Sequence, residues 1–178
     1  MRTEDPSSLR IVDLWTFRSI KSNKRYIVEI EHFSNNFFGI KFYWKGVANS
    51  KKRYSFLTND NEPRTIVMSC IQIMLKYHEN HPLASFGFVA AEDNQHNNAT
   101  LHNTTIQNNC INKRFRFYRR MMLSLFSPEK FCQYSDKKSN IYLLLNKYAL
   151  SQRHITLQMI EKEIEALYEG EYSITPED

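Results

Sequence analysis

Apolar and polar residues alternate along the first part of the chain, which is the pattern of half-buried β-strands. In residues 25–33, Tyr26, Val28 and Ile30 fall on one face of the predicted strand. Similar patterns occur in residues 11–20, 37–45 and 53–58. Because short polar turns or loops separate these stretches, the sequence predicts an antiparallel meander of four strands.

The hydrophobic period changes from strand-like to helical after this meander. The segment Asn59-Asp60-Asn61-Glu62-Pro63 combines capping side chains with a proline, which is a helix-start signal, and it predicts a helix over residues 64–79. Residues 85–91 then form a short, nearly all-apolar run. Such a run is typical of a strand that is buried on both faces of a sheet.

A long polar segment, rich in asparagine, separates the two halves of the chain at residues 92–111. A loop of this length is usually functional or disordered. The pattern after it predicts a helix over residues 112–126, and then a hairpin and a final amphipathic helix. The hairpin strands are residues 131–134 and 141–148, and the final helix covers residues 155–168.

This order of elements predicts an α+β fold in one domain of residues 1–178, with a layered, α/β-like arrangement of helices around one mixed sheet. We expect the tails, residues 1–8 and 170–178, to be flexible. The order also resembles the GNAT-type N-acetyltransferase fold over about residues 11–148. The resemblance implies that the strand at residues 85–91 splays from its neighbour. A looser resemblance links the Arg114-Phe115-Arg116-Phe117-Tyr118 pattern to bacterial families with an R-x-R-x-Y helix at this place.

The resemblance to GNAT-type enzymes also implies a set of functional residues. In that family, the start of the helix after the meander holds the pyrophosphate of acyl-CoA, and a tyrosine on the next helix is often the general acid. Here this implies that Arg64 meets phosphate, that amides near Ala90 meet the thioester carbonyl and that Tyr118 is the acid. Tyr118 also lies on the apolar stripe of its helix, so burial in the core is the competing interpretation.

The chain departs from the family at the cofactor loop. Close approach to phosphate needs bare backbone amides, yet residues 59–65 contain no glycine, and Pro63 has no N–H group. Asp60 and Glu62 add negative charge where the ligand would bring more. We therefore expect no bound cofactor, with acetyl-CoA as the alternative.

The helix at residues 112–126 carries the strongest signal that core packing does not explain. It holds five cations and no acidic residue, and Lys113, Arg116 and Arg120 are spaced to share one face. The complete basic set is Lys113, Arg114, Arg116, Arg119 and Arg120. Such a set can grip phosphates, although a solvated face that pairs with acids elsewhere has the same pattern.

Composition and residue spacing narrow the range of possible partners, metal sites and cellular locations. The net charge of +5 permits nucleic acid or another polyanion as a partner. The cysteines, Cys70, Cys110 and Cys132, form no CxxC pair, and the histidines lack a third ligand near His78 and His81, so we expect no metal site. No apolar run is long enough to span a membrane. We expect no membrane contact and a cytoplasmic location, because the N-terminus lacks an apolar signal region.

Two functions follow as expectations. The first is a non-catalytic binding or regulatory module on a GNAT-like scaffold, whose basic helix contacts a polyanion such as nucleic acid, or a partner protein. The second is an acyl-CoA-dependent N-acyltransferase with a non-standard cofactor loop. Docking on a larger protein through the final helix is a third use of the same sequence features.

Overall fold

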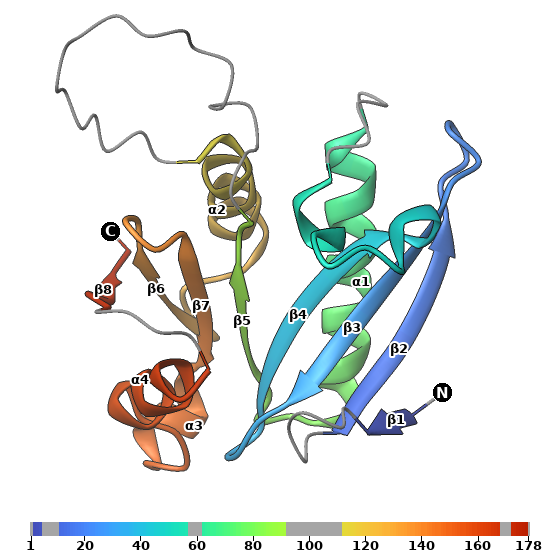
Figure 1. The fold of residues 1–178 in the computed structure, drawn as a ribbon. Coiled ribbons are helices and arrows are strands. Elements are labelled where there is room, and N and C mark those ends of the chain that lie inside the picture. The colour runs from blue at the N-terminus through green and yellow to red at the C-terminus, as the bar shows by residue number, and fades with distance from the viewer. Residues whose placement is uncertain (1, 5–10, 57–61, 92–111, 168–171, 178) are drawn as a thin grey trace, which may run out of the picture.

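A single mixed sheet with helices on both sides forms the core of the protein (Figure 1). The computed structural model describes residues 2–4, 11–56, 62–91, 112–167 and 172–177. Within these ranges the sheet has eight strands in the order β1-β2-β3-β4-β5-β7-β6-β8. The predicted α+β class is therefore confirmed, and the predicted loop at residues 92–111 lies outside the described residues.

The meander consists of β2 (Ile11–Arg18), β3 (Arg25–His32) and β4 (Phe37–Trp44), which pair antiparallel as predicted. Val28 and Ile30 are fully buried, which confirms the buried face inferred from their alternation. Asparagines make the turns between these strands. Asn23 has a φ of 58°, a left-handed conformation that asparagine tolerates better than most residues.

The prediction of a fourth strand in the meander was wrong. Residues 53–55 form a short 3-10 helix, η2 (Arg53–Ser55), after the similar η1 (Lys45–Val47). The carbonyl oxygens of Tyr54 and Ser55 accept hydrogen bonds from the Arg114 guanidinium at 2.8 and 2.6 Å. A distant side chain thus takes the backbone acceptors that a neighbouring strand would have used.

The second half of the fold follows the predicted order closely. It contains α1 (Pro63–Asn80), β5 (Ser85–Val89), α2 (Lys113–Leu125), β6 (Phe131–Asp136) and β7 (Ile141–Asn146). It ends with α3 (Lys147–Ser151), α4 (Leu157–Glu165) and β8 (Thr175–Pro176). The hairpin strand that we predicted to reach residue 148 ends earlier, because Asn146 caps α3 by accepting from the Ala149 N–H.

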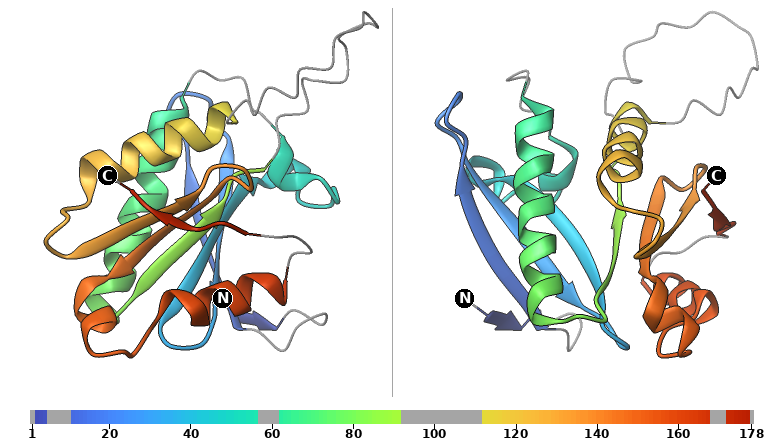
Figure 2. Two further views of the ribbon diagram at one scale, coloured as in Figure 1. Left: turned by 90° about the vertical axis from the view of Figure 1, so that its left-hand side faces the viewer. Right: turned by 180° about the vertical axis from the view of Figure 1, so that it is seen from behind.

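Two hydrophobic clusters cover the two faces of the sheet. The larger cluster joins α1 and α2 to the sheet, with Cys70, Phe115 and Tyr142 among its buried members. The smaller cluster packs α3 and α4 against β7, around residues such as Leu145 and Ile160. Figure 2 shows the resulting layers, with α1 and α2 on one side of the sheet and α4 on the other.

Two short strands were not predicted. β1 (Arg2–Glu4) adds to β2, and β8 adds to β6, so parts of both tails pair with the sheet. Residues 172–177 are all described, and Ile174 among them is buried, whereas residues 1, 5–8, 170–171 and 178 of the expected flexible tails lie outside the described residues. Strands this short carry no alternation by which a sequence could reveal them.

Candidate ligand-binding cleft

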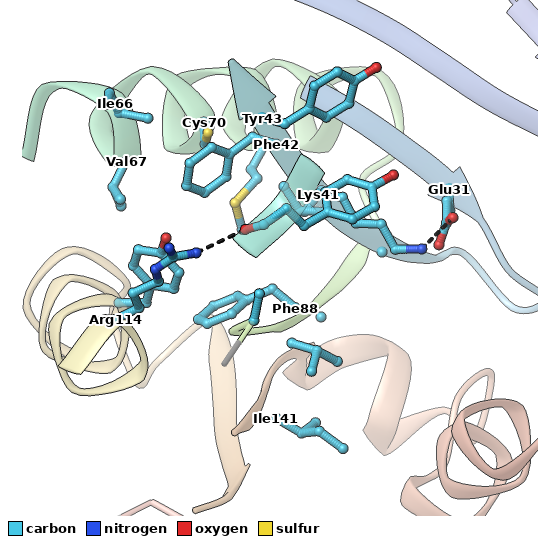
Figure 3. A pocket seen from close by; sticks show the side chains of 18 of the residues that line it. Glu31, Lys41, Phe42, Tyr43, Ile66, Val67, Cys70, Phe88, Arg114 and Ile141 are labelled. Atoms are coloured by element: carbon cyan, nitrogen blue, oxygen red, sulfur yellow. Dashed lines mark hydrogen bonds and ion pairs between the residues drawn. The ribbon is translucent and has the colours of Figure 1, made fainter. Parts of the chain in front are cut away.

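The neighbouring strands β4 and β5 run parallel but stay paired over only a short distance. Their register pairs are Phe37–Ser85, Phe38–Phe86 and Gly39–Gly87. Beyond this point the strands diverge, and a cavity of about 700 Å³ lies between them (Figure 3). This volume falls within the range of small-molecule sites, roughly 300–1,000 Å³.

The last pair before the divergence consists of two glycines for a steric reason. A Cβ atom on Gly87 would lie 2.6 Å from the Phe37 ring and 3.1 Å from Leu143. Phe37 is buried, so its ring has little room to move. The bare backbone of Gly87 therefore lets the Phe37 ring fill the base of the cleft.

The walls of the cleft are mostly apolar and come from elements that are far apart in sequence. Helix α1 contributes Ile66, Val67, Cys70 and Met74, and α2 contributes Phe117, Tyr118 and Met122. The diverging strands add aromatic and aliphatic side chains, namely Phe42, Tyr43, Phe88 and Val89. Val89 is 43% exposed, so only the first half of β5 is buried on both faces as we predicted. The exposure follows from the position of Val89 on the open edge of the cleft.

Tyr118 lies in this cleft and is only partly buried. Its ring meets Phe42 and Phe88 edge-on, with centroids 6.0 and 5.5 Å apart. The structure therefore gives Tyr118 access to a ligand, whereas its place on the apolar stripe of α2 had favoured burial. The periodicity of α2 alone could not reveal this exposure, because the cleft exists only where β4 and β5 part.

The five cations of α2 do not act as one set. Lys113, Arg116 and Arg120 are exposed, as their spacing predicted, and Lys113 also lines the cleft. Arg114 instead donates to the carbonyl oxygens of Tyr54 and Ser55 in η2, and Figure 3 shows its side chain at the cleft. Arg119 pairs with Glu177 near the C-terminus. The other three cations are exposed, and none of them forms an ion pair within the part of the chain that the structure describes.

Burial alone would raise the pKa of the Glu177 carboxyl. Hydrogen bonds from Arg119 and Ser135, together with the charges of Arg119 and Lys137, outweigh this effect, and the pKa of Glu177 lies below its ordinary value. Glu177 is therefore ionised at neutral pH and forms a true ion pair with Arg119.

The start of α1 does not fit a bound pyrophosphate. Glu62 precedes the helix, Pro63 supplies no N–H group, and Arg64 is exposed and does not line the cleft. Two like charges about 4 Å apart repel by about 4 kcal/mol at an effective dielectric constant of about 20. A helix N-terminus attracts an anion by only about 0.3–1 kcal/mol. The Glu62 carboxylate therefore outweighs the helix end, and a phosphate is disfavoured there.

The residue expected near an acyl thioester is also placed differently. Ala90 is buried and does not line the cleft, and its N–H group already donates to the Asn140 carbonyl at 3.0 Å. The neighbouring Ala91 does line the cleft.

A polar network covers the meander where η2 folds over it. The Tyr54 hydroxyl donates to the buried carboxylate of Glu29, and Arg53 donates to the same hydroxyl at 2.8 Å. Burial, followed by the negative charge of Glu29, raises the pKa of Tyr43 to about 12, and burial raises the pKa of Tyr54 as well. Both tyrosines therefore stay protonated at neutral pH and can donate hydrogen bonds.

A second polar cluster lies at the opposite end of α1 and was not foreseen. Tyr77 donates to Asp13, and the His32 Nε2 atom lies 2.9 Å from the same carboxylate. Trp15 and Phe38 pack edge-on against Tyr77. All of these polar groups have partners, so this cluster ties β2 and β3 to α1.

Cysteines, metal ligands and membrane-spanning helices add no candidate site within the described residues. Cys70 is a buried free thiol, and burial raises its pKa to about 12. No group of three or more His, Cys, Asp or Glu residues in the described ranges is arranged to hold a metal ion. None of the described helices is both long enough and apolar enough to cross a membrane. Cys110 lies outside the described residues.

Comparisons of the chain with protein-family models, with curated proteins and with solved structures found no match. The residues of the cleft are therefore the basis for assigning a function.

Proposed function

We propose that this chain is a binding module on a GNAT-like scaffold and that its ligand is an elongated, amphipathic anion. The apolar part of the ligand lies between β4 and β5, and its anionic part faces the exposed start of α2. The observation that carries the proposal is the divergence of β4 and β5 after three residue pairs, which leaves a largely apolar cavity of about 700 Å³.

Two features support the GNAT-like part of the proposal. A meander is followed by helix, strand, helix and hairpin, and the strand after the first helix lies parallel to the last strand of the meander. The two parallel strands then part, as the resemblance implies. Both features concern topology, so they support the GNAT-like scaffold only. The activity has to be argued from the residues of the cleft.

The charges around the cleft favour a position near α2 for the anionic group of the ligand. Lys113 lines the cleft and is exposed, and no acidic residue lies on its helix. Glu62, on the α1 side, repels anions. An anionic ligand therefore finds its favourable position at the α2 side of the mouth, and Arg116 and Arg120 extend the positive surface outward.

Calorimetric titration with octanoate at low salt tests this proposal. We expect Val89→Trp, which fills the open edge of the cleft, to weaken binding about 10-fold or more, and Lys113→Glu to weaken it in a salt-dependent way. Ile11→Trp and Lys162→Glu are matched controls, because both residues are exposed and neither lines the cleft. Absence of heat from octanoate and from longer carboxylates at millimolar concentration contradicts the proposal.

A nucleic acid or an acidic partner protein would use the outer face of α2 instead of the cleft. Titration of the chain with a short DNA duplex at low salt distinguishes this use. In that case Arg116→Glu and Arg120→Glu would abolish binding, whereas Val89→Trp would leave it unchanged.

A second candidate function is N-acyl transfer, and the position of Tyr118 is the observation that favours it. Tyr118 lines the cleft between Phe42 and Phe88, where a phenol can donate a proton to a leaving group. Such an enzyme would hold its acyl donor without phosphate contacts at the start of α1.

An assay of thiol release from acetyl-CoA, with a panel of primary amines as acceptors, tests this second function. If it is correct, Tyr118→Phe lowers kcat about 100-fold or more while the protein stays folded. Failure of acetyl-CoA to shift the melting temperature at millimolar concentration, together with no thiol release, rules it out.

A further inference from the structure

One side of the cleft carries a buried carboxylate, although most of the lining is apolar. Glu62, directly before α1, is only 5% exposed and lines the cavity. The Ser19 hydroxyl donates to its Oε2 atom, but its buried Oε1 atom accepts no hydrogen bond from the part of the chain that the structure describes. One oxygen of a buried carboxylate is thus left for another donor.

Helix capping does not explain this carboxylate. An acidic residue at this position usually accepts a hydrogen bond from the first turn of its helix. The Glu62 side chain makes no such bond to α1, and Pro63 at the first helical position has no N–H group to offer. Among the described residues, Ser19 is therefore the hydrogen-bond partner that orients the Glu62 carboxylate.

The other buried carboxylate oxygen of the cleft has a different environment. Glu31 also lines the cavity, and its Oε2 atom accepts no hydrogen bond among the described residues. However, its Oε1 atom lies 2.6 Å from the Lys41 ammonium, so the charge of Glu31 is balanced. Glu62 forms no ion pair with any described residue, and a buried charge without a partner is unfavourable.

We infer that Glu62 binds a protonated amine of the ligand. The ligand class is an apolar chain that carries a primary ammonium group, which meets Oε1 of Glu62 at the α1 side of the mouth. This inference rests on the proposed use of the cleft, and it adds a cationic group opposite the anionic group at Lys113. An ammonium supplies both a hydrogen-bond donor and the missing countercharge.

Octylamine and octanoate, matched in length, are suitable probes in calorimetric titrations. For the wild type we expect both to bind. In Glu62→Gln, which keeps the shape and a hydrogen-bond partner for Ser19, octylamine should lose about 10-fold or more in affinity, and octanoate should bind equally well or more tightly. Glu165→Gln on α4 removes the same charge from an exposed residue that does not line the cleft, and it should change neither affinity.

Ser19→Ala is the second variant, because it removes the hydrogen bond and keeps the carboxylate. It should retain octylamine binding to within a few-fold, which separates loss of charge from loss of local packing. Equal octylamine affinity in the wild type and Glu62→Gln, or no octylamine binding to the wild type, overturns the inference. Octanoate binding that depends on Val89 and Lys113 would still support the proposed function in that case, so the two failures are distinguishable.

Discussion

The Arg119 guanidinium pairs with the Glu177 carboxylate and joins α2 to the C-terminal segment 58 residues further along the chain. The side chain of Glu177 is only 2% exposed, and Ser135 on β6 donates to its other oxygen. A residue that looked like part of a basic binding surface therefore fixes α2 against the sheet.

Arg119→Ala should destabilise the protein by about 1–3 kcal/mol, because a buried carboxylate is left without its cation. For a chain of this length, each kcal/mol lowers the melting temperature by about 2–4 °C. Arg116→Ala is the matched control, since Arg116 is exposed on the same helix, and it should change stability by less than about 0.5 kcal/mol. Equal melting temperatures for the two variants would contradict this role of Arg119.

The same pair predicts a pH dependence of stability. The pKa of Glu177 is lower in the folded protein than its ordinary value of 4.5. The stabilisation from the ionised carboxylate is therefore fully present above about pH 4.5 and is lost as the pH falls through the lower, folded-state pKa. The stability difference between the wild type and Glu177→Gln, measured by urea unfolding, should shrink below pH 4.5 and stay constant from pH 6 to 8.

Gly87→Ala should destabilise the base of the cleft. Its Cβ atom would lie 2.6 Å from the buried Phe37 ring, and overpacking of this kind costs about 1–3 kcal/mol. Gly39→Ala is a control at the register partner of Gly87, because its Cβ atom would meet Phe33, which is only partly buried and can move. Urea unfolding should show the larger loss for Gly87→Ala, and the reverse order would refute this account.

Asn112 links the end of β5 to α2 with both ends of its amide. Its Oδ1 atom accepts from the Arg114 N–H at 2.8 Å, and its Nδ2 group donates to the Ala91 carbonyl at 2.7 Å. Asn112→Ala should cost about 1 kcal/mol. Asn112→Asp keeps the helix cap and loses only the bond to Ala91, so chemical denaturation should show a smaller loss. A loss as large as that of Asn112→Ala would mean that the link to Ala91 dominates.

The two cysteines in the described residues should differ in reactivity. Cys70 is buried with a pKa raised to about 12, whereas Cys132 is half-buried. Because the thiolate is the reactive form, iodoacetamide at pH 7.5 should label Cys132 well before Cys70. Peptide mass spectrometry of the native protein measures both rates. Labelling of Cys70 at the rate of an unfolded control would show that the cleft opens to solvent far more than this structure indicates.

The sequence predicted those elements whose pattern is local. The alternation of Tyr26, Val28 and Ile30 is enough to define β3, and the apolar residues of α1 follow helical spacing along most of its length. Residues 53–55 show why other predictions failed. Their fold depends on Arg114, a residue about 60 positions away, which no local pattern can reveal.

The candidate site was harder to predict than the fold because it depends on where two strands separate. Lys113 and Tyr118 were both singled out, and the structure brings both to the cleft. Arg64 and Ala90 were also singled out, but neither lines it. Glu62 was noticed as an unfavourable charge for phosphate. Its burial, and the lack of a described hydrogen-bond partner for its Oε1 atom, depend on how Ser19, the start of α1 and the cavity come together in the fold.

The bridge from Arg114 to η2 bears on how fast the ligand that we propose would exchange. Arg114 belongs to α2 on one side of the cleft, whereas η2 follows β4 on the other side, and both line the cavity (Figure 3). A ligand that passes between them must wait until these hydrogen bonds open. For the proposed ligand we therefore expect residence time and affinity to be set separately, with the bridge governing how long it stays and the apolar walls governing how tightly it is held.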